Sequence, residues 1–373
     1  MSEKSLLLDR RTLLAGTAAV TLAAATSARA AAPALELVAT FTSPRQVTGV
    51  AVSKTGRVFV NFPRWEEDVA ISVGELMPDG SVTPFPNGAW NAYRNADPTA
   101  ASPGDSFVCV QSVTVDAQGR LWVLDAAAPG LTFIVSGGPK LVCIDLSSNS
   151  VSRIYQFGTD VAPQGTYLND VRFTKNGAAA VITNSGTPGS LIVLDLASGA
   201  ARRVLDGHPS TQFDQSLVIT VGGRELRMLD GQPPHFSADG LIIDPLGAFV
   251  FWQATTGNTI YAAPLAVLFD TSLSAEQVGA SVQVLARSFV ADGYWLTRKL
   301  VPLLTSCEDN SVKRINSDGS YSVEVQDDRL LWPDSMAEGP DGMVYVTASH
   351  IPEMKMWQGP GITFTQLFRF RPR

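Results

Sequence analysis

Apolar and polar residues alternate along this chain in short runs. In the stretch Gln111–Asp125, apolar residues stand at Val113 and Val115, a turn follows at Gly119, and a second apolar run covers Leu121–Leu124. Alternation with a period of two is typical of a strand, and a continuous apolar run of this length is typical of a buried one. The stretch therefore predicts a tight antiparallel hairpin.

The same hairpin recurs along the chain, with a turn glycine six residues after an apolar position. Five copies share this spacing: Val50 and Gly56, Val113 and Gly119, Val171 and Gly177, Leu241 and Gly247, Met336 and Gly342. A sixth copy at 292–304 has Leu300 at the glycine position. Further strand pairs at 139–157, 189–205 and 310–325 give two hairpins per unit. Because four-stranded propeller blades take roughly 40 to 50 residues, we predict an all-β, six-bladed β-propeller.

The two ends of the chain predict how this ring closes. Leu35–Phe41 reads as a strand without a hairpin partner, and Gln366–Phe370 is also strand-like. The last unit otherwise has only two strands, at 336–340 and 343–347. A closed ring hides its strand edges, so we expect the N-terminal strand to join the C-terminal blade as its outer member.

Residues 1–30 have the features of an export signal. Arg10 and Arg11 precede an apolar, small-residue run, and Ala28-Arg29-Ala30 matches a cleavage site. The stretch DRRTLLAG resembles a twin-arginine signal. We expect cleavage, a periplasmic or secreted protein without membrane contact, and one monomeric propeller domain over residues 31–373. The alternative, a membrane anchor, needs a longer apolar span.

Charge and cysteine usage exclude several partners. The chain has 28 Lys and Arg against 35 Asp and Glu, a formal net charge of −7, and no basic cluster. We therefore expect no nucleic acid partner. Cys109 and Cys143 could form a bridge or remain buried thiols, and Cys307 stands apart. The three scattered histidines and the glycine pattern predict no zinc, haem, flavin or nucleotide.

A column of polar residues precedes the repeated strands. If the first strand of each blade lines the axis, the residue two places before the repeat position lies at the mouth of the central channel. That column reads Thr48, Gln111, Asn169, Asp239, Asp292 and Asp334. A hairpin returns to its starting face, so the ends of second strands are expected at the same rim, with Asp170 beside Asn169: Asn61, Asp125, Asn184 and Gln253.

Converging carboxylates and amides repel one another unless they hold a cation, share protons or bind a polar ligand. We predict calcium or another divalent cation at Asn169, Asp239, Asp292 and Asp334. Acid–base roles are assigned to Asp239 and Asp292, with His235 as a proton shuttle, and ligand contacts are expected from five residues: Gln111, Asp125, Asp170, Asn184 and Gln253. The plainer alternatives are Asp-Gly pairs that cap turns and an ordinary loop histidine.

Two other segments stand out from the repeats. The insert 61–105 contains a strand pair, at 70–77 and 81–85, and a loop with Trp90 and Tyr93. That loop either borders a binding site or packs on its own blade. The segments 265–268 and 274–278 read as short helices over the fourth blade.

Several stretches carry a family resemblance, from about residue 35 to 373. GRLWVLDAAAPG, TYLNDVRFTKNGAAAVITNSGTPGSLIVLDLASGAARRVLDGHPS, DGLIIDPLGAFVFWQATTGNTIYAAPLAVL and LLWPDSMAEGPDGMVYVTAS resemble the bacterial branch of the major royal jelly/Yellow family. The resemblance implies an exported six-bladed propeller, in a family that includes dopachrome-converting proteins and non-enzymatic binding or storage proteins. A more distant likeness to gluconolactonase propellers implies metal ligands at Asn169, Asp239, Asp292 and Asp334, although Thr48 replaces the Glu of that group.

Three functions remain open from the sequence. The first is an exported protein that binds a small polar ligand at the channel mouth and acts as a dopachrome-type tautomerase. The second is a metal-dependent lactonase that uses the same rim. The third is a binding protein without catalysis.

Overall fold

The structure is a computed structural model that describes residues 34–66 and 68–373. The predicted signal segment, residues 1–30, lies outside the described residues. The described residues belong to one compact unit. Within them, no helix is long and apolar enough to cross a membrane.

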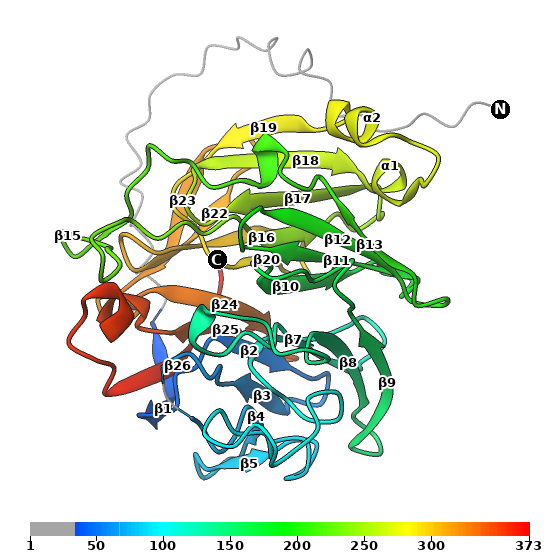
Figure 1. The fold of residues 1–373 in the computed structure, drawn as a ribbon. Coiled ribbons are helices and arrows are strands. Elements are labelled where there is room, and N and C mark those ends of the chain that lie inside the picture. Colours follow the sequence, from blue (N-terminus) through cyan, green and yellow to red (C-terminus); the bar gives the residue numbers. More distant parts are fainter. Residues whose placement is uncertain (1–33, 67) are drawn as a thin grey trace, which may run out of the picture. The chain divides into compact units, whose positions relative to one another are not determined.

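Six four-stranded antiparallel sheets form the blades of a β-propeller (Figure 1). The first three blades are β2 (Gly49–Val52), β3 (Val58–Asn61), β4 (Val73–Leu76), β5 (Val82–Pro84); β6 (Val110–Val115), β7 (Leu121–Asp125), β8 (Lys140–Asp145), β9 (Ser150–Gln156); and β10 (Leu168–Phe173), β11 (Ala179–Asn184), β12 (Ser190–Asp195), β13 (Ala201–Val204). The next three are β16 (Ala238–Ile243), β17 (Phe249–Ala254), β18 (Thr259–Pro264), β19 (Gln283–Arg287); β20 (Tyr294–Leu296), β21 (Pro302–Ser306), β22 (Ser311–Ile315), β23 (Tyr321–Gln326); and β24 (Pro333–Glu338), β25 (Val344–Ala348), β26 (Phe364–Phe370), β1 (Glu36–Thr42).

The remaining elements are short. They are the hairpin β14 (Thr220–Val221) and β15 (Arg224–Glu225), the helices α1 (Leu265–Phe269) and α2 (Ala275–Ala280), and four 3-10 turns at Pro129–Leu131, Pro209–Thr211, Ile351–Glu353 and Lys355–Trp357. The sequence pattern predicted both helices, and Ser274 begins α2 with a capping box. The hairpin β14–β15 was not predicted, because it is only two residues long on each side.

The ring closes as the sequence predicted. The inner strands β2, β6, β10, β16, β20 and β24 each contact the next, and β24 contacts β2 again. The N-terminal strand β1 pairs antiparallel with β26, so that Glu36 lies opposite Arg369. Blue β1 therefore lies beside red β26 in the same sheet (Figure 1). Pairing the two chain ends in one blade removes a free edge from the ring.

The repeated turn glycine is explained by its backbone conformation. Gly119 at the β6–β7 turn has a φ of 87°, and the other four repeat glycines are also left-handed. Glycine enters this region without the steric cost that a Cβ brings. Leu300, in the fifth blade, takes the same conformation, with a φ of 63°. The irregular hairpin at 292–304 therefore keeps the turn geometry and accepts the steric cost of a Cβ.

The inner strands break their pairing at the polar column. The register shifts between Val110 and Ser112 in β6, and three further shifts occur in β10, β16 and β24. Gln111, Asn169, Asp239 and Asp334 fall within these four breaks. Bulges of this kind release a residue from the ladder and re-aim its side chain. The channel mouth is therefore built from residues that the sheets leave unpaired.

The Asp-Gly pairs are explained by close approach between blades. A Cβ at Gly240 would lie 2.4 Å from the carbonyl oxygen of Asp292, and one at Gly293 would lie 1.9 Å from that of Asp334. Real Cβ contacts are never this short, so only glycine lets neighbouring inner strands come together here. These glycines therefore serve blade packing, while the aspartates before them face the cavity described below.

All three cysteines are buried and free. The open choice between a Cys109–Cys143 bridge and free thiols is thus decided for thiols. Burial, first of all, raises the pKa of Cys109 to about 12, which keeps the thiol protonated and unreactive.

Candidate functional site

A cavity of about 370 Å³ opens at one mouth of the central channel. Five of the six column residues line it: Gln111, Asn169, Asp239, Asp292 and Asp334. Thr48 does not, because its hydroxyl donates to the backbone oxygen of Gln111 instead. The propeller geometry inferred from the repeats therefore brought five of the six column residues together at one channel mouth, and their functional role stays a prediction.

Asp239 and Asp292 form a buried pair on the floor of this cavity. Their carboxyl groups lie close enough to shift each other's pKa. Burial, and then the neighbouring Asp292, raise the pKa of Asp239 well above its usual range. Burial also raises the pKa of Asp292 to about 7, although the indole N–H of Trp332, 2.6 Å away, stabilises its carboxylate. Asp239 therefore binds a proton more tightly than an ordinary aspartate, and Asp292 ionises near neutral pH.

Asp334 is the third acid of the cavity. Burial, and then the charge of Asp292, raise the pKa of Asp334 well above the ordinary value. Its Oδ1 accepts a hydrogen bond from the Ser335 hydroxyl at 3.2 Å. All three acids of the cavity thus have pKa values above the ordinary aspartate value, and that of Asp292 lies near neutrality.

Trp332, whose indole N–H donates to Asp292, has a strained backbone conformation. Its φ is 54°, a left-handed conformation that is an outlier for a bulky side chain. Such strain persists only where the surrounding structure imposes it, and it is frequent at functional sites. Here the consequence is an indole N–H aimed at the carboxylate of Asp292.

A chain of hydrogen bonds leads from the cavity wall to the pair. The Trp65 indole donates to the Tyr167 hydroxyl (2.6 Å), which donates to Gln111 Oε1 (2.8 Å). Gln111 Nε2 donates to Asn169 Oδ1 (3.2 Å), and Asn169 Nδ2 donates to Asp239 Oδ2 (2.7 Å). Together with Asp292 and Trp332, this series of residues includes members from all six blades or from the loops next to them.

The cavity walls are mostly apolar and aromatic. Trp65, Tyr167, Phe236, Trp332 and Trp357 all line it. The sequence analysis assigned none of the five to the site, because four of them lie outside the strand repeats and only Tyr167, two residues before Asn169, carries a positional signal. The predicted aromatic loop plays no part here. Trp90 packs on Phe107, and Tyr93 is buried within its own insert.

His235 lines the cavity as the sequence analysis suggested. Its ring is exposed and stacks on Phe213, with centroids 3.9 Å apart and planes 6° from parallel. Stacking holds the imidazole at the cavity wall with at least one ring nitrogen free for solvent. The shuttle role stays a prediction.

Two predicted ligand residues, Asp125 and Asp170, lie outside the cavity lining. Asp125 is buried beside Lys140, whose Nζ donates to its Oδ2 at 2.8 Å, and it accepts from the backbone N–H groups of Val108 and Cys109. Asp170 pairs with Arg172 at 3.2 Å. Burial raises the pKa of Asp170, and the ion pair opposes this rise. Both carboxylates already make ion pairs or hydrogen bonds within the blades, and these contacts hold the strands in place.

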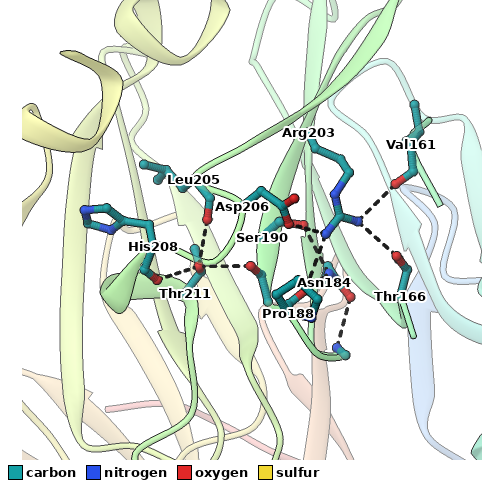
Figure 2. Close-up of polar contacts among 12 residues, drawn as sticks. Val161, Thr166, Asn184, Pro188, Ser190, Arg203, Leu205, Asp206, His208 and Thr211 are labelled. Carbon is teal, nitrogen blue, oxygen red and sulfur yellow. Dashed lines mark hydrogen bonds and ion pairs between the residues drawn. The ribbon is translucent and has the colours of Figure 1, made fainter. Parts of the chain in front are cut away.

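Asn184 and Gln253 are likewise structural. Asn184 Nδ2 donates to the backbone oxygen of Pro188 at 2.8 Å (Figure 2). Its Oδ1 accepts from the backbone N–H of Tyr167. Gln253 Nε2 donates to the backbone oxygen of Phe289 at 2.7 Å. The second strand of a hairpin does return to the rim. The side chain at its end, however, hydrogen-bonds to the backbone of a neighbouring loop. The prediction that these residues contact a ligand is not supported.

Arg203 supports one wall of the cavity. Its guanidinium donates to the backbone oxygen of Val161 (3.2 Å) and the hydroxyl of Thr166 (2.9 Å), and it pairs with Asp206 (Figure 2). It also reaches the backbone oxygen of Pro188. The loops around Thr166 and Pro188 both border the cavity, so one buried cation joins them.

The predicted metal ligands do not present a cation site in this arrangement. Across residues 34–66 and 68–373, no three His, Cys, Asp or Glu side chains are placed so that they could hold a metal ion. Asn169 turns its amide nitrogen, not its oxygen, toward Asp239, whereas calcium and similar hard cations bind oxygen. Calcium stays a prediction that this geometry does not support.

Comparison with known proteins places the chain in a family. The family model described as Major royal jelly protein matches residues 108–356. The chain belongs to the major royal jelly protein family. Protein yellow of Drosophila pseudoobscura pseudoobscura is 28% identical over 137 residues, which are 34% of this chain and 23% of that protein. Dopaminechrome tautomerase of Drosophila melanogaster is 26% identical over 122 residues, 31% of this chain and 25% of that protein.

The aligned part thus spans about a quarter of the length of these curated relatives. Among solved structures, a gluconolactonase from Xanthomonas campestris superposes with a TM-score of 0.52 at 13% identity, covering 92% of this chain and 95% of that one. At this identity the likeness shows the propeller fold alone. The major royal jelly protein family and the propeller, both predicted from the sequence, are confirmed.

Proposed function

We propose that this royal jelly family propeller binds a small aromatic molecule at the channel mouth and isomerises it as a tautomerase of catechol-derived quinones. The observation that carries the proposal is the pair of buried acids, Asp239 and Asp292, that line an aromatic cavity. The partial match to a dopaminechrome tautomerase supports the same reaction class. Tautomerisation needs a base and an acid held close together. Asp292, which ionises near neutral pH, can supply the base, and Asp239, whose pKa is raised well above the ordinary value, can supply the acid.

The reaction requires no external reagent. A C–H bond of the substrate breaks, and its proton passes to the carboxylate of Asp292. The electron pair moves into the ring, and the quinone oxygen takes the proton of Asp239 and becomes a phenol. The proton on Asp292 then passes back to Asp239, which restores the starting pair. The substrate is neither oxidised nor reduced.

The lining also defines the ligand's charge. In the described part of the chain, Asp239, Asp292 and Asp334 are the acids of the cavity and no Lys or Arg lines it. Aromatic faces attract cations and stack on planar rings. We therefore expect neutral or cationic ring systems to bind, and carboxylated ones to bind more weakly.

Absorbance measurements test this proposal. Purified protein is mixed with dopaminechrome, and with dopachrome, which carries a carboxylate, and loss of the visible absorbance is followed. Asp292→Asn should lower the rate by about 10²- to 10⁴-fold, the usual contribution of a positioned acid or base. Asp79→Asn, in an exposed turn of the first blade, is the matched control and should have no effect.

Other outcomes would replace the proposal. Turnover that is unchanged in Asp239→Asn and Asp292→Asn would show that the pair is not catalytic. Ligand-dependent thermal stabilisation without turnover would favour a binding protein. Hydrolysis of a lactone that chelator abolishes would favour the lactonase.

Export and the monomeric state also belong to the proposal. N-terminal sequencing of protein from the periplasm should begin close to residue 31, after the predicted cleavage site. Light scattering should report one chain per particle. A retained N-terminus would indicate an anchor instead.

A further inference from the structure

Trp65 stands at one end of the series of hydrogen bonds at the channel mouth. As the first donor, it determines which partner donates and which accepts in each later bond. An indole N–H can only donate, so Trp65 obliges the Tyr167 oxygen to accept. The hydroxyl proton of Tyr167 is then free to point at Gln111, whose oxygen must face it. Each later member follows from the one before it, because an amide that accepts on one side donates on the other.

Asn169 is the last amide in this sequence. Gln111 offers it an N–H, so the Asn169 oxygen faces Gln111 and its nitrogen faces Asp239. The second proton of that nitrogen goes to the Ser185 hydroxyl at 3.0 Å. Both ends of the Asn169 amide are therefore occupied, and its oxygen is turned away from the acids.

We propose that Trp65 is a positioning residue that makes the channel mouth a hydrogen-bonding site instead of a cation site. Through Tyr167 and Gln111 it fixes the Asn169 amide so that an N–H, rather than an oxygen, meets Asp239. A cation held between the acids would need the reverse orientation, since a donor hydrogen pointing at it repels it. The inference concerns the site of the proposed function, but it depends on no substrate.

The chain offers variants that separate this role from simple packing. Trp65→Phe removes the donor and keeps an aromatic ring in the wall. Trp357→Phe is the matched control, since Trp357 lines the same cavity but takes no part in this chain of hydrogen bonds. Gln111→Glu is a second, nearly isosteric change. Its carboxylate cannot donate to Asn169, so the Asn169 amide should turn around.

Amide orientation is measured by NMR with selective ¹⁵N labelling of asparagine. Asn169→Asp assigns the Asn169 signal. In wild type, the side-chain NH₂ of Asn169 should be protected from exchange and shifted by its short bond to the carboxyl group. Trp357→Phe should leave this signal in place, and Trp65→Phe and Gln111→Glu should each abolish the shift. An unchanged Asn169 signal in Trp65→Phe would overturn the proposal.

Calcium provides an independent readout. Calcium should not raise the Tm of wild type or Trp357→Phe, and it should raise the Tm of Gln111→Glu, in which oxygens face the acids. A calcium-dependent Tm increase in wild type that Asp239→Asn removes would refute the proposal. Neither experiment uses a quinone, so failure of the tautomerase proposal would leave this inference standing, and the reverse also holds.

Discussion

Replacing Asp292 with Asn should make the protein more stable at alkaline pH while it removes activity. The pKa of Asp292 is raised by burial, from 3.8 to about 7. A carboxyl group with a raised native pKa binds its proton more tightly in the folded state. Its stabilising contribution is therefore complete below the unfolded pKa and is lost as the pH rises through the native value. An amide at this position does not ionise and escapes that loss.

The size of the effect follows from the two pKa values. One pKa unit corresponds to about 1.4 kcal/mol, so the full penalty for ionising Asp292 in the fold is about 4 kcal/mol. Between pH 5 and pH 8 the part that changes is about 2 to 3 kcal/mol. For a chain of this size, at about 2 cal/mol/K per residue, that corresponds to about 3 to 4 °C in Tm.

Thermal unfolding of wild type and Asp292→Asn at several pH values tests this reasoning. The Tm difference between the two proteins should change in favour of the variant by the amount above as the pH rises from 5 to 8. Asp79→Asn is the control, because Asp79 lies in an exposed turn. Its Tm difference from wild type should stay constant from pH 5 to pH 8. A Tm difference for Asp292→Asn that stays constant from pH 5 to pH 8 would refute the raised pKa.

Two further substitutions probe the scaffold. Lys140→Met should lower the free energy of unfolding by about 3 to 5 kcal/mol, because it leaves the buried charge of Asp125 without its partner; a urea titration that finds less than 1 kcal/mol would contradict this. Gly293→Ala should cost at least about 1 to 3 kcal/mol, because the new Cβ meets the backbone oxygen of Asp334. Gly88→Ala, with open space around it, should be neutral, and equal melting of the two variants would argue against close blade contact.

The column of polar residues was predictable because a repeat fixes where each strand starts. A constant offset from the turn position, which is glycine except at Leu300, identified Asp239, Asp292 and Asp334 before any contact was known. The same reasoning failed for Asp125 and Asn184. Their positions at the strand ends were right, but the backbone groups that bind their side chains belong to loops whose course no periodicity encodes.

By itself, the sequence determined the fold of this protein. Alternation, turn glycines and repeat spacing act over a few residues, so six blades and their closure could be derived from local pattern. Only the tertiary structure decided the chemistry. Whether Asn169 offers oxygen or nitrogen to Asp239, and which carboxyl keeps the proton, depends on donors such as Trp65 and Trp332 from distant parts of the chain. Hydrogen-bond direction and burial are properties of the assembled cavity, and no single segment contains them.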